Sequence, residues 1–270
     1  MASLRKKNIR ADGKGNFPVS ILKGFFHGSS GNTIGLHPVP IKEIFEMEAK
    51  LIGMGAQKAK ERERDYERYV SRLVDAVRGE HRDIAIETAE RRTNNIIVQN
   101  VPSLVERKLI ENIINTFKQK FGARYRSGAK LIESVANNEF NCYSSGVVMA
   151  DVFYRLDIPA GIVTAWSIAI PGHVTSRTQR YLVETTRRAN PIHEAEKIAL
   201  YYKIAYDVGV DELPGVAWYS HGIKMARGYR INEAVEAFDR ALELMPGNIV
   251  VEFEKANILD DYKSISRWYR

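Results

Sequence analysis

One cysteine, one histidine and one glutamate have the residue types and the spacing that nucleophilic catalysis by a thiol requires. Cys142 is the single cysteine of the 270-residue chain. We expect it at the start of a helix, where the helix dipole and the free backbone N–H groups favour a thiolate. His173 follows 31 residues later, directly after Pro171-Gly172, and Glu184 follows after a further 11 residues. On adjacent antiparallel strands, the carboxylate could orient the imidazole while the other ring nitrogen faces the thiol.

The segments around these residues predict an α+β fold. Leu131–Asn138 is typical of a short helix, and Cys142 opens a second helix that ends before Asp157-Ile158-Pro159. After it, Ile162–Ile170 is β-branched and apolar enough for a buried strand. Two further strands are expected at Val174–Arg177 and Tyr181–Thr185. We therefore expect the helix that carries Cys142 to pack on an antiparallel sheet, with helical segments before and after it.

Three motifs occur in a fixed order between about residues 128 and 187. Asn141-Cys142 opens a helix that is followed by Leu156-Asp157-Ile158-Pro159-Ala160, then by His173-Val174 and by a strand that contains Glu184. This arrangement resembles the cysteine helix, the His-Val pair and the Asp/Glu element of the transglutaminase-like (papain-related) superfamily. Three positions depart from the usual pattern of that family: Asp157 replaces Gly, Glu184 replaces the commoner Asp, and Thr175 replaces an aromatic residue. The third departure leaves the substrate groove unspecified.

The resemblance implies a thiol hydrolase, a peptidase or amidase, that acts on a peptide or protein substrate through an acyl-enzyme. Cys142 would attack the carbonyl carbon, His173 would move the proton and Glu184 would hold the imidazole. The Cys142 N–H would contribute to the oxyanion hole. Candidates for a second donor, which capping and turn chemistry explains equally well, are Asn141, Asn138 and Asn137. Transfer of the acyl group to an amine, as in transglutaminases, is the alternative to hydrolysis.

Other reaction chemistries find no support in the sequence. The chain has no C-x-x-C or H-E-x-x-H motif and its six histidines are scattered, so we expect no metal site. It also lacks the glycine-rich phosphate-binding motifs and the G-x-S-x-G turn of serine hydrolases. We therefore expect an enzyme without a cofactor.

A helical segment is expected over residues 191–270, and it contains one repeat signature. The spacing resembles one tetratricopeptide unit of about 34 residues, at positions Trp218, Gly222, Ala234, Phe238, Ala241 and Pro246. Two helices would cross closely at the small residues, with Phe238 filling the gap and Ile249–Tyr269 capping the unit. Because a single unit needs a neighbour to bury its faces, it would pack on the α+β body or on a protein partner. The rival hypothesis is accordingly a non-catalytic protein-interaction scaffold that uses this repeat.

The remaining segments differ in charge. The net charge of the chain is +7, and residues 1–40, with six basic groups and one acidic group, contribute +5 of it. We interpret this segment as a basic, irregular, solvated extension and expect no nucleic-acid partner, because aromatic residues do not alternate with the basic ones. Residues 41–125 are predicted to be a helical segment, and residues 126–190 the catalytic core. No uncharged apolar run approaches the roughly 18 residues of a membrane span, so a cytoplasmic protein is expected.

Overall fold

The computed structural model of the protein describes residues 38–80, 103–166, 172–178, 180–185, 192–194 and 202–268. The chain divides into two units, Met1–Asn32 and Thr33–Arg270, and every described element belongs to the second unit. The basic extension expected over residues 1–40 lies outside the described residues except for its last three. The last four residues of the strand predicted at Ile162–Ile170 also lie outside the described residues.

Five strands form an antiparallel sheet in the order β6-β5-β4-β3-β7. They are β3 (Ala160–Trp166), β4 (His173–Thr178), β5 (Tyr181–Val183), β6 (Ile192–Glu194) and β7 (Ile204–Val208). Strand β3 pairs with β4 on one side and β7 on the other, so that Ala165 lies opposite both His173 and Ala205. Four consecutive β3 residues, 162–165, are buried, as in a strand that is covered on both faces. The mixed helix and antiparallel-sheet architecture agrees with the predicted α+β class.

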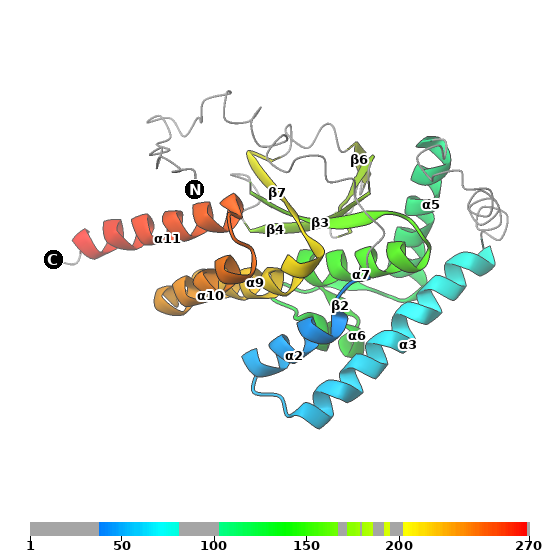
Figure 1. Cartoon of the computed structure of the whole chain (residues 1–270), viewed down its shortest axis with the longest axis horizontal. Coiled ribbons are helices and arrows are strands. Elements are labelled where there is room, and N and C mark those ends of the chain that lie inside the picture. Colours follow the sequence, from blue (N-terminus) through cyan, green and yellow to red (C-terminus); the bar gives the residue numbers. More distant parts are fainter. Residues whose placement is uncertain are drawn as a thin grey trace, which may run out of the picture. The chain divides into compact units, whose positions relative to one another are not determined.

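Helix α7 (Cys142–Arg155) lies between this sheet and the helices of the amino-terminal half (Figure 1). It contacts β3 and β4 on one side and α3 (Ala56–Glu80) and α6 (Leu131–Asn137) on the other. Its residues from 143 to 153 are all buried, which is typical of a helix that is covered all round. The helix is followed by Asp157, whose φ of 66° falls in the left-handed region where glycine is usual and aspartate is tolerated. Asp157 thus adopts a backbone conformation that glycine would adopt with less strain.

The amino-terminal helices support the segment that precedes Cys142. Helix α2 (Ile41–Leu51) is separated from α3 by a turn in which Gly53 has a φ of 65°. The buried Glu48 of α2 accepts hydrogen bonds from the backbone N–H groups of Leu131 and Ile132, at 3.1 and 2.7 Å. A carboxylate thus satisfies the free donors at the start of α6 and ties the two helices together. Further elements here are α5 (Ser103–Asn115), the π-helical turn η2 (Thr116–Lys120), and the parallel pair β1 (Arg124–Tyr125) and β2 (Glu139–Phe140).

The carboxy-terminal helices cross as closely as the repeat signature predicts. Helices α9 (Leu213–Arg227) and α10 (Ile231–Leu244) form a hairpin, preceded by the short turn η4 (Val210–Glu212) and followed by α11 (Ile249–Trp268). A Cβ atom added to Gly222 would come within 2.6 Å of the Phe238 ring, so only glycine fits between the two helices. The expectation of a wholly helical segment over residues 191–270 was wrong, however, because β6 and β7 lie within it. Strand β7 is stabilised by pairing with the distant β3, a long-range contact that no local periodicity reports.

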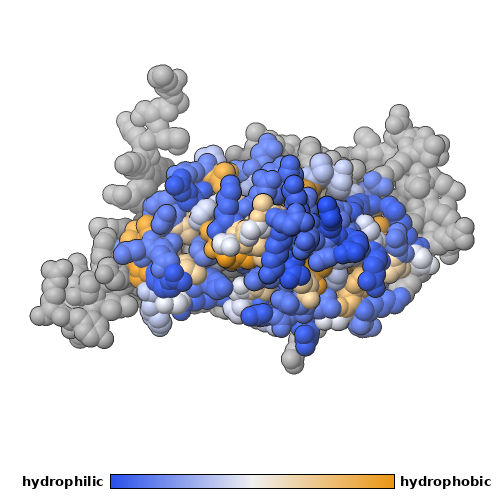
Figure 2. Space-filling view, turned by 90° about the horizontal axis from the view of Figure 1, so that it is seen from below, coloured by the Kyte–Doolittle hydropathy of each residue, from blue (hydrophilic) through white to orange (hydrophobic). Residues whose placement is uncertain are grey.

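Hydrophilic residues predominate on the face in Figure 2, and apolar residues form only small patches on it. No helix among the described segments combines the length and the apolar character that a membrane crossing demands.

Candidate active site

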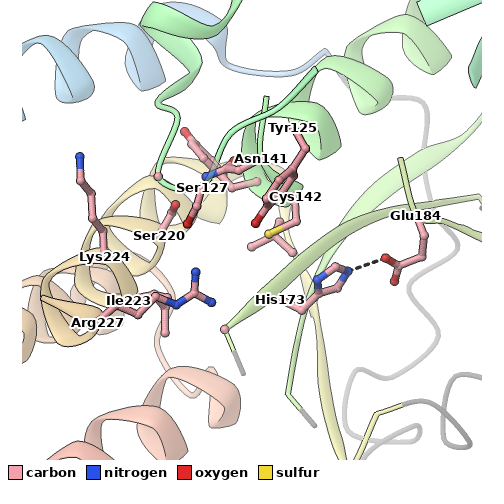
Figure 3. A pocket seen from close by; sticks show the side chains of 14 residues that line it. Tyr125, Ser127, Asn141, Cys142, His173, Glu184, Ser220, Ile223, Lys224 and Arg227 are labelled. Atoms are coloured by element: carbon pink, nitrogen blue, oxygen red, sulfur yellow. Dashed lines mark ion pairs between the residues drawn. The ribbon is translucent and has the colours of Figure 1, made fainter. Parts of the chain in front are cut away.

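A cavity of about 290 Å³ lies between the start of α7, the start of β4 and one face of α9 (Figure 3). The three residues predicted to act together, Cys142, His173 and Glu184, all line it. Residues around β1 and residues of α9 complete the wall. Sequence reasoning did not expect α9 to contribute to the site, because the small residues of the repeat signature indicated packing only.

Cys142 is half-buried at the first position of α7. The preceding residue, Asn141, holds the helix start in a capping box: its side-chain oxygen accepts from the Ser144 N–H at 2.8 Å, and the Ser144 hydroxyl oxygen accepts from the Asn141 N–H at 3.0 Å. This arrangement orients the first turn of the helix, whose remaining N–H groups and positive dipole end lie beside the sulfur. The predicted position of Cys142 at a helix start is therefore confirmed.

Two hydrogen bonds govern the ionisation of the Cys142 thiol. Burial on its own raises the pKa of the thiol, but the hydrogen bond and positive charge of His173 and a hydrogen bond from the Val174 N–H oppose it. Their combined effect exceeds that of burial and lowers the pKa of Cys142 below its ordinary value. The site therefore favours the thiolate, the nucleophilic form of cysteine.

His173 lies between the thiol and a carboxylate. Its Nε2 atom is 2.7 Å from Oε2 of Glu184, and its other ring nitrogen lies on the side of the Cys142 sulfur (Figure 3). Burial lowers the pKa of His173, but hydrogen bonds to Cys142 and Glu184, together with the charges of both groups, outweigh it and raise the pKa to about 10. Because the imidazolium is stabilised from both sides, the favoured state is an imidazolium next to a thiolate.

The hairpin of β4 and β5 brings His173 and Glu184 together. The two strands pair antiparallel, with Ser176 opposite Val183, so that Glu184 directly follows the last paired residue of β5. At the other end of the hairpin the Thr178 hydroxyl accepts from the Tyr181 N–H at 3.2 Å and donates to Glu106 of α5 at 2.6 Å. The turn of the hairpin is thus hydrogen-bonded to α5.

Tyr202 is a part of this site that sequence reasoning missed. Its ring stacks on the imidazole of His173, with centroids 5.5 Å apart and an angle of 17° between the planes, and its hydroxyl donates a short hydrogen bond to Glu184. Both Tyr202 and Glu184 are almost fully buried. The sequence holds no signal for this contact, because Tyr202 lies 29 residues beyond His173 and belongs to none of the recognised motifs.

The asparagine candidates for the oxyanion hole separate into two groups. Asn141 lines the cavity, although its side-chain oxygen is used in the cap of α7. Asn137 and Asn138 form the end of α6, where Asn138 adopts a left-handed conformation with φ of 52°, and neither lines the cavity. Capping and turn chemistry therefore account for Asn137 and Asn138.

Trp166 and His221 both make aromatic contacts. Trp166 is half-buried against Phe253, with ring centroids 4.6 Å apart, and His221 lies edge-on to Trp218, with centroids 6.3 Å apart. Within the described ranges, no three His, Cys, Asp or Glu side chains are grouped so that they could hold a metal ion.

Comparisons of the chain with protein-family models, with curated proteins and with solved structures found no match. Any statement about its function accordingly depends on the chemistry of the site itself.

Proposed function

We propose that this protein is a thiol hydrolase, a peptidase or amidase, that acts through Cys142, His173 and Glu184. The observation that carries the proposal is the continuous chain of contacts from the thiol through the imidazole to the carboxylate, on the wall of an open cavity. A thiol, a base and a group that orients the base are the parts that nucleophilic catalysis by cysteine needs.

Each residue has a defined part in the proposed reaction. The Cys142 thiolate attacks the carbonyl carbon of the amide, and the negative charge that develops on oxygen is stabilised by the N–H groups at the start of α7. The His173 imidazolium then gives its proton to the leaving amine, and a thioester on Cys142 remains. In the second half, neutral His173 takes a proton from a water molecule, and the resulting hydroxide attacks the thioester and frees the acid. Glu184 holds the imidazole in place in both halves.

The order of elements supports a place within the transglutaminase-like class. A buried helix that starts at Cys142 packs on β3 and β4, the base opens β4, and the carboxylate follows the adjacent β5. The carboxy-terminal helices that resemble a tetratricopeptide unit would then have two roles, because α9 packs against α10 and also forms one wall of the cavity. The hydrogen bond between Cys142 and His173 favours an enzyme over a scaffold, because a scaffold has no use for an activated thiol.

Alkylation of the single cysteine by iodoacetamide tests the proposal. At pH 6 an ordinary thiol, with a pKa of about 8.5, is almost entirely protonated and reacts slowly. We expect the wild-type protein to be labelled at least about tenfold faster than the His173→Ala variant at this pH, and Cys142→Ala to take up no label at cysteine. Equal, slow labelling of wild type and His173→Ala would argue decisively against a paired thiolate.

A second measurement separates hydrolysis from acyl transfer. With p-nitrophenyl acetate the Cys142 thiolate displaces p-nitrophenolate and forms an acetyl thioester, which water converts to acetate. With methylamine present, an acyl transferase converts the thioester to N-methylacetamide instead. With methylamine present, we expect acetate to remain the main product. If N-methylacetamide were the main product, the protein would be an acyl transferase and not a hydrolase.

A further inference from the structure

The cavity has two chemically different sides. Cys142 and His173 form one side, with Glu184 beyond the imidazole, whereas Ser220, Lys224 and Arg227 of α9 approach from the other side (Figure 3). Lys224 and Arg227 are three residues apart and therefore lie on one face of the helix. The α9 side thus presents two basic groups to whatever occupies the cavity.

The acidic residue of the cavity does not neutralise these groups. Glu184 is ion-paired with His173 at 2.7 Å and hydrogen-bonded to Tyr202, so its charge is used within the triad. Among the residues that the structure describes, no carboxylate forms an ion pair with Lys224. Glu254 of α11 interacts electrostatically with Arg227, and Arg227 has a further interaction within the protein. Lys224 therefore contributes a positive charge to the α9 side of the cavity, and Arg227 adds a guanidinium group that has its own interactions.

Neighbouring groups respond to the charge of Lys224. The pKa of His221, on the same helix, is lowered to about 4 by burial and by the positive charges of Lys130, Lys224 and Arg230. Burial also lowers the pKa of Lys130, although Glu48 opposes this, and Lys224 lowers it further. Lys130 and Lys224 are thus close enough for their positive charges to disfavour one another, which an anionic ligand would relieve.

Packing holds the Lys224 side chain in place. A Cβ atom added to Gly128 would be only 3.4 Å from Cδ of Lys224, so the lysine stem lies across the loop that carries Ser127 and Gly128. That loop also lines the cavity. The stem therefore lies against this loop although Lys224 as a residue is exposed, and such a contact reduces the side-chain entropy that is lost when a ligand binds.

We propose that the substrate carries a carboxylate within a few bonds of the scissile amide, and that Lys224 and Arg227 bind this carboxylate. The inference rests on the thiol hydrolase proposed above and adds to it the substrate class. A guanidinium suits a carboxylate because it donates two parallel hydrogen bonds, and the ammonium group adds a second charge. A volume of about 290 Å³ lies at the small end of ligand pockets, which span about 300–1,000 Å³. It suits an acidic amino-acid side chain or a terminal carboxylate beside the amide.

A matched pair of alkylating reagents tests the charge preference without knowledge of the natural substrate. N-iodoacetylglycine carries a carboxylate four bonds from the reacting carbon, and N-iodoacetylglycinamide has the same framework without the charge. The quantity to measure is the ratio of their second-order rates at Cys142, for wild type, Lys224→Gln, Arg227→Gln and the double variant. Lys58→Gln, which removes the same unit of charge at an exposed position of α3 away from the cavity, is the control.

We expect the ratio to fall about threefold in each single variant and about tenfold in the double variant, with no change in Lys58→Gln. In wild type the ratio should also fall when salt is added, because ions screen exposed charges. A ratio that is the same in wild type and the double variant would overturn the carboxylate site.

The neutral reagent separates this failure from a failure of the proposed function. Fast labelling by N-iodoacetylglycinamide at pH 6 that depends on His173, combined with an unchanged ratio, would leave the thiol hydrolase in place and remove only the substrate class. Slow labelling that does not depend on His173 would remove both. Because Lys224 and Arg227 are exposed, we expect the variants to fold, which circular dichroism checks.

Discussion

The ring of Tyr202 lies nearly parallel to the imidazole of His173, with the two centroids 5.5 Å apart. The same tyrosine donates a hydrogen bond to Glu184, the carboxylate that pairs with this imidazole. One residue therefore supports two members of the proposed triad, one by stacking and the other by hydrogen bonding. Such a contact fixes the orientation of the base before a substrate arrives.

Substituting Tyr202 by Phe should reduce stability while the stacked ring is kept. Glu184 is almost fully buried and would lose a hydrogen bond to a charged group, which costs about 1.5–3 kcal/mol of unfolding free energy. Urea denaturation at pH 7 measures the loss. Tyr206→Phe is the matched control, since its hydroxyl bonds to Glu212 at a partly buried position and should contribute less. Equal losses of unfolding free energy in the two variants would mean that the Tyr202–Glu184 hydrogen bond contributes no more to stability than the Tyr206–Glu212 hydrogen bond.

Substituting Glu184 by Gln should lower the pKa of His173. The hydrogen bond and the negative charge of Glu184 help to raise this pKa to about 10, and the neutral amide removes the charge. We expect the imidazole to titrate closer to its ordinary value of about 6.5. The thiolate–imidazolium pair would then be lost at a lower pH than in wild type. An NMR titration of the histidine ring protons, with His173 assigned from a His173→Gln variant, reports the change.

A glutamine at position 212 is the control for that titration, because Glu212 bonds to Tyr206 and Gly209 rather than to the site. Glu212→Gln should leave the titration of His173 unchanged. The same titration midpoint in wild type and Glu184→Gln would contradict an electrostatic role for Glu184.

The buried Glu254 should make stability fall as the pH rises from about 4.5 to about 7. Burial raises the pKa of Glu254 to about 7, against a hydrogen bond from the Gly172 N–H and the charge of Arg227. Because the folded pKa lies above the unfolded value, folding favours the protonated carboxyl. The penalty is absent below the unfolded pKa, grows between the two values and is complete above the folded one.

A Glu254→Gln variant removes this dependence while keeping an oxygen that can accept from Gly172. We expect the variant to exceed wild type in unfolding free energy by about 3 kcal/mol at pH 8 and to match it near pH 4. Urea denaturation across this pH range gives the difference directly. A difference that does not vary with pH would show that Glu254 has the same pKa in the folded and unfolded states.

Replacing Gly222 by Ala should destabilise the α9–α10 hairpin. The added Cβ atom would lie 2.6 Å from the Phe238 ring, which has no free space in the core, so overpacking should cost about 1–3 kcal/mol. Gly55→Ala adds the same methyl group where no atom lies within 4 Å. Thermal unfolding should show a clear decrease in Tm for Gly222→Ala and little change for Gly55→Ala, and the reverse order would exclude a close helix crossing at Gly222.

Local sequence patterns determined the elements that carry the three predicted site residues. Asn141 and the apolar residues after Cys142 predicted a helix, and the segments that follow Pro171-Gly172 predicted two strands, one beginning near His173 and the other containing Glu184. These signals are local, because a cap and a periodic apolar face act within a few residues of the chain. The turn at Gly53 that separates α2 from α3 was not predicted, and neither were strands β1 and β2, which pair over only two residues each.

Tertiary structure alone decided what surrounds the three predicted site residues. Tyr202 stacks on His173, β7 completes the sheet beside β3, and Lys224 and Arg227 face the cavity from α9. Each of these contacts joins segments that are tens of residues apart, and it depends on which face of one element packs against another. Helical spacing places Lys224 and Arg227 on one face of α9, but whether that face meets solvent or a nucleophile depends on the packing of the whole core.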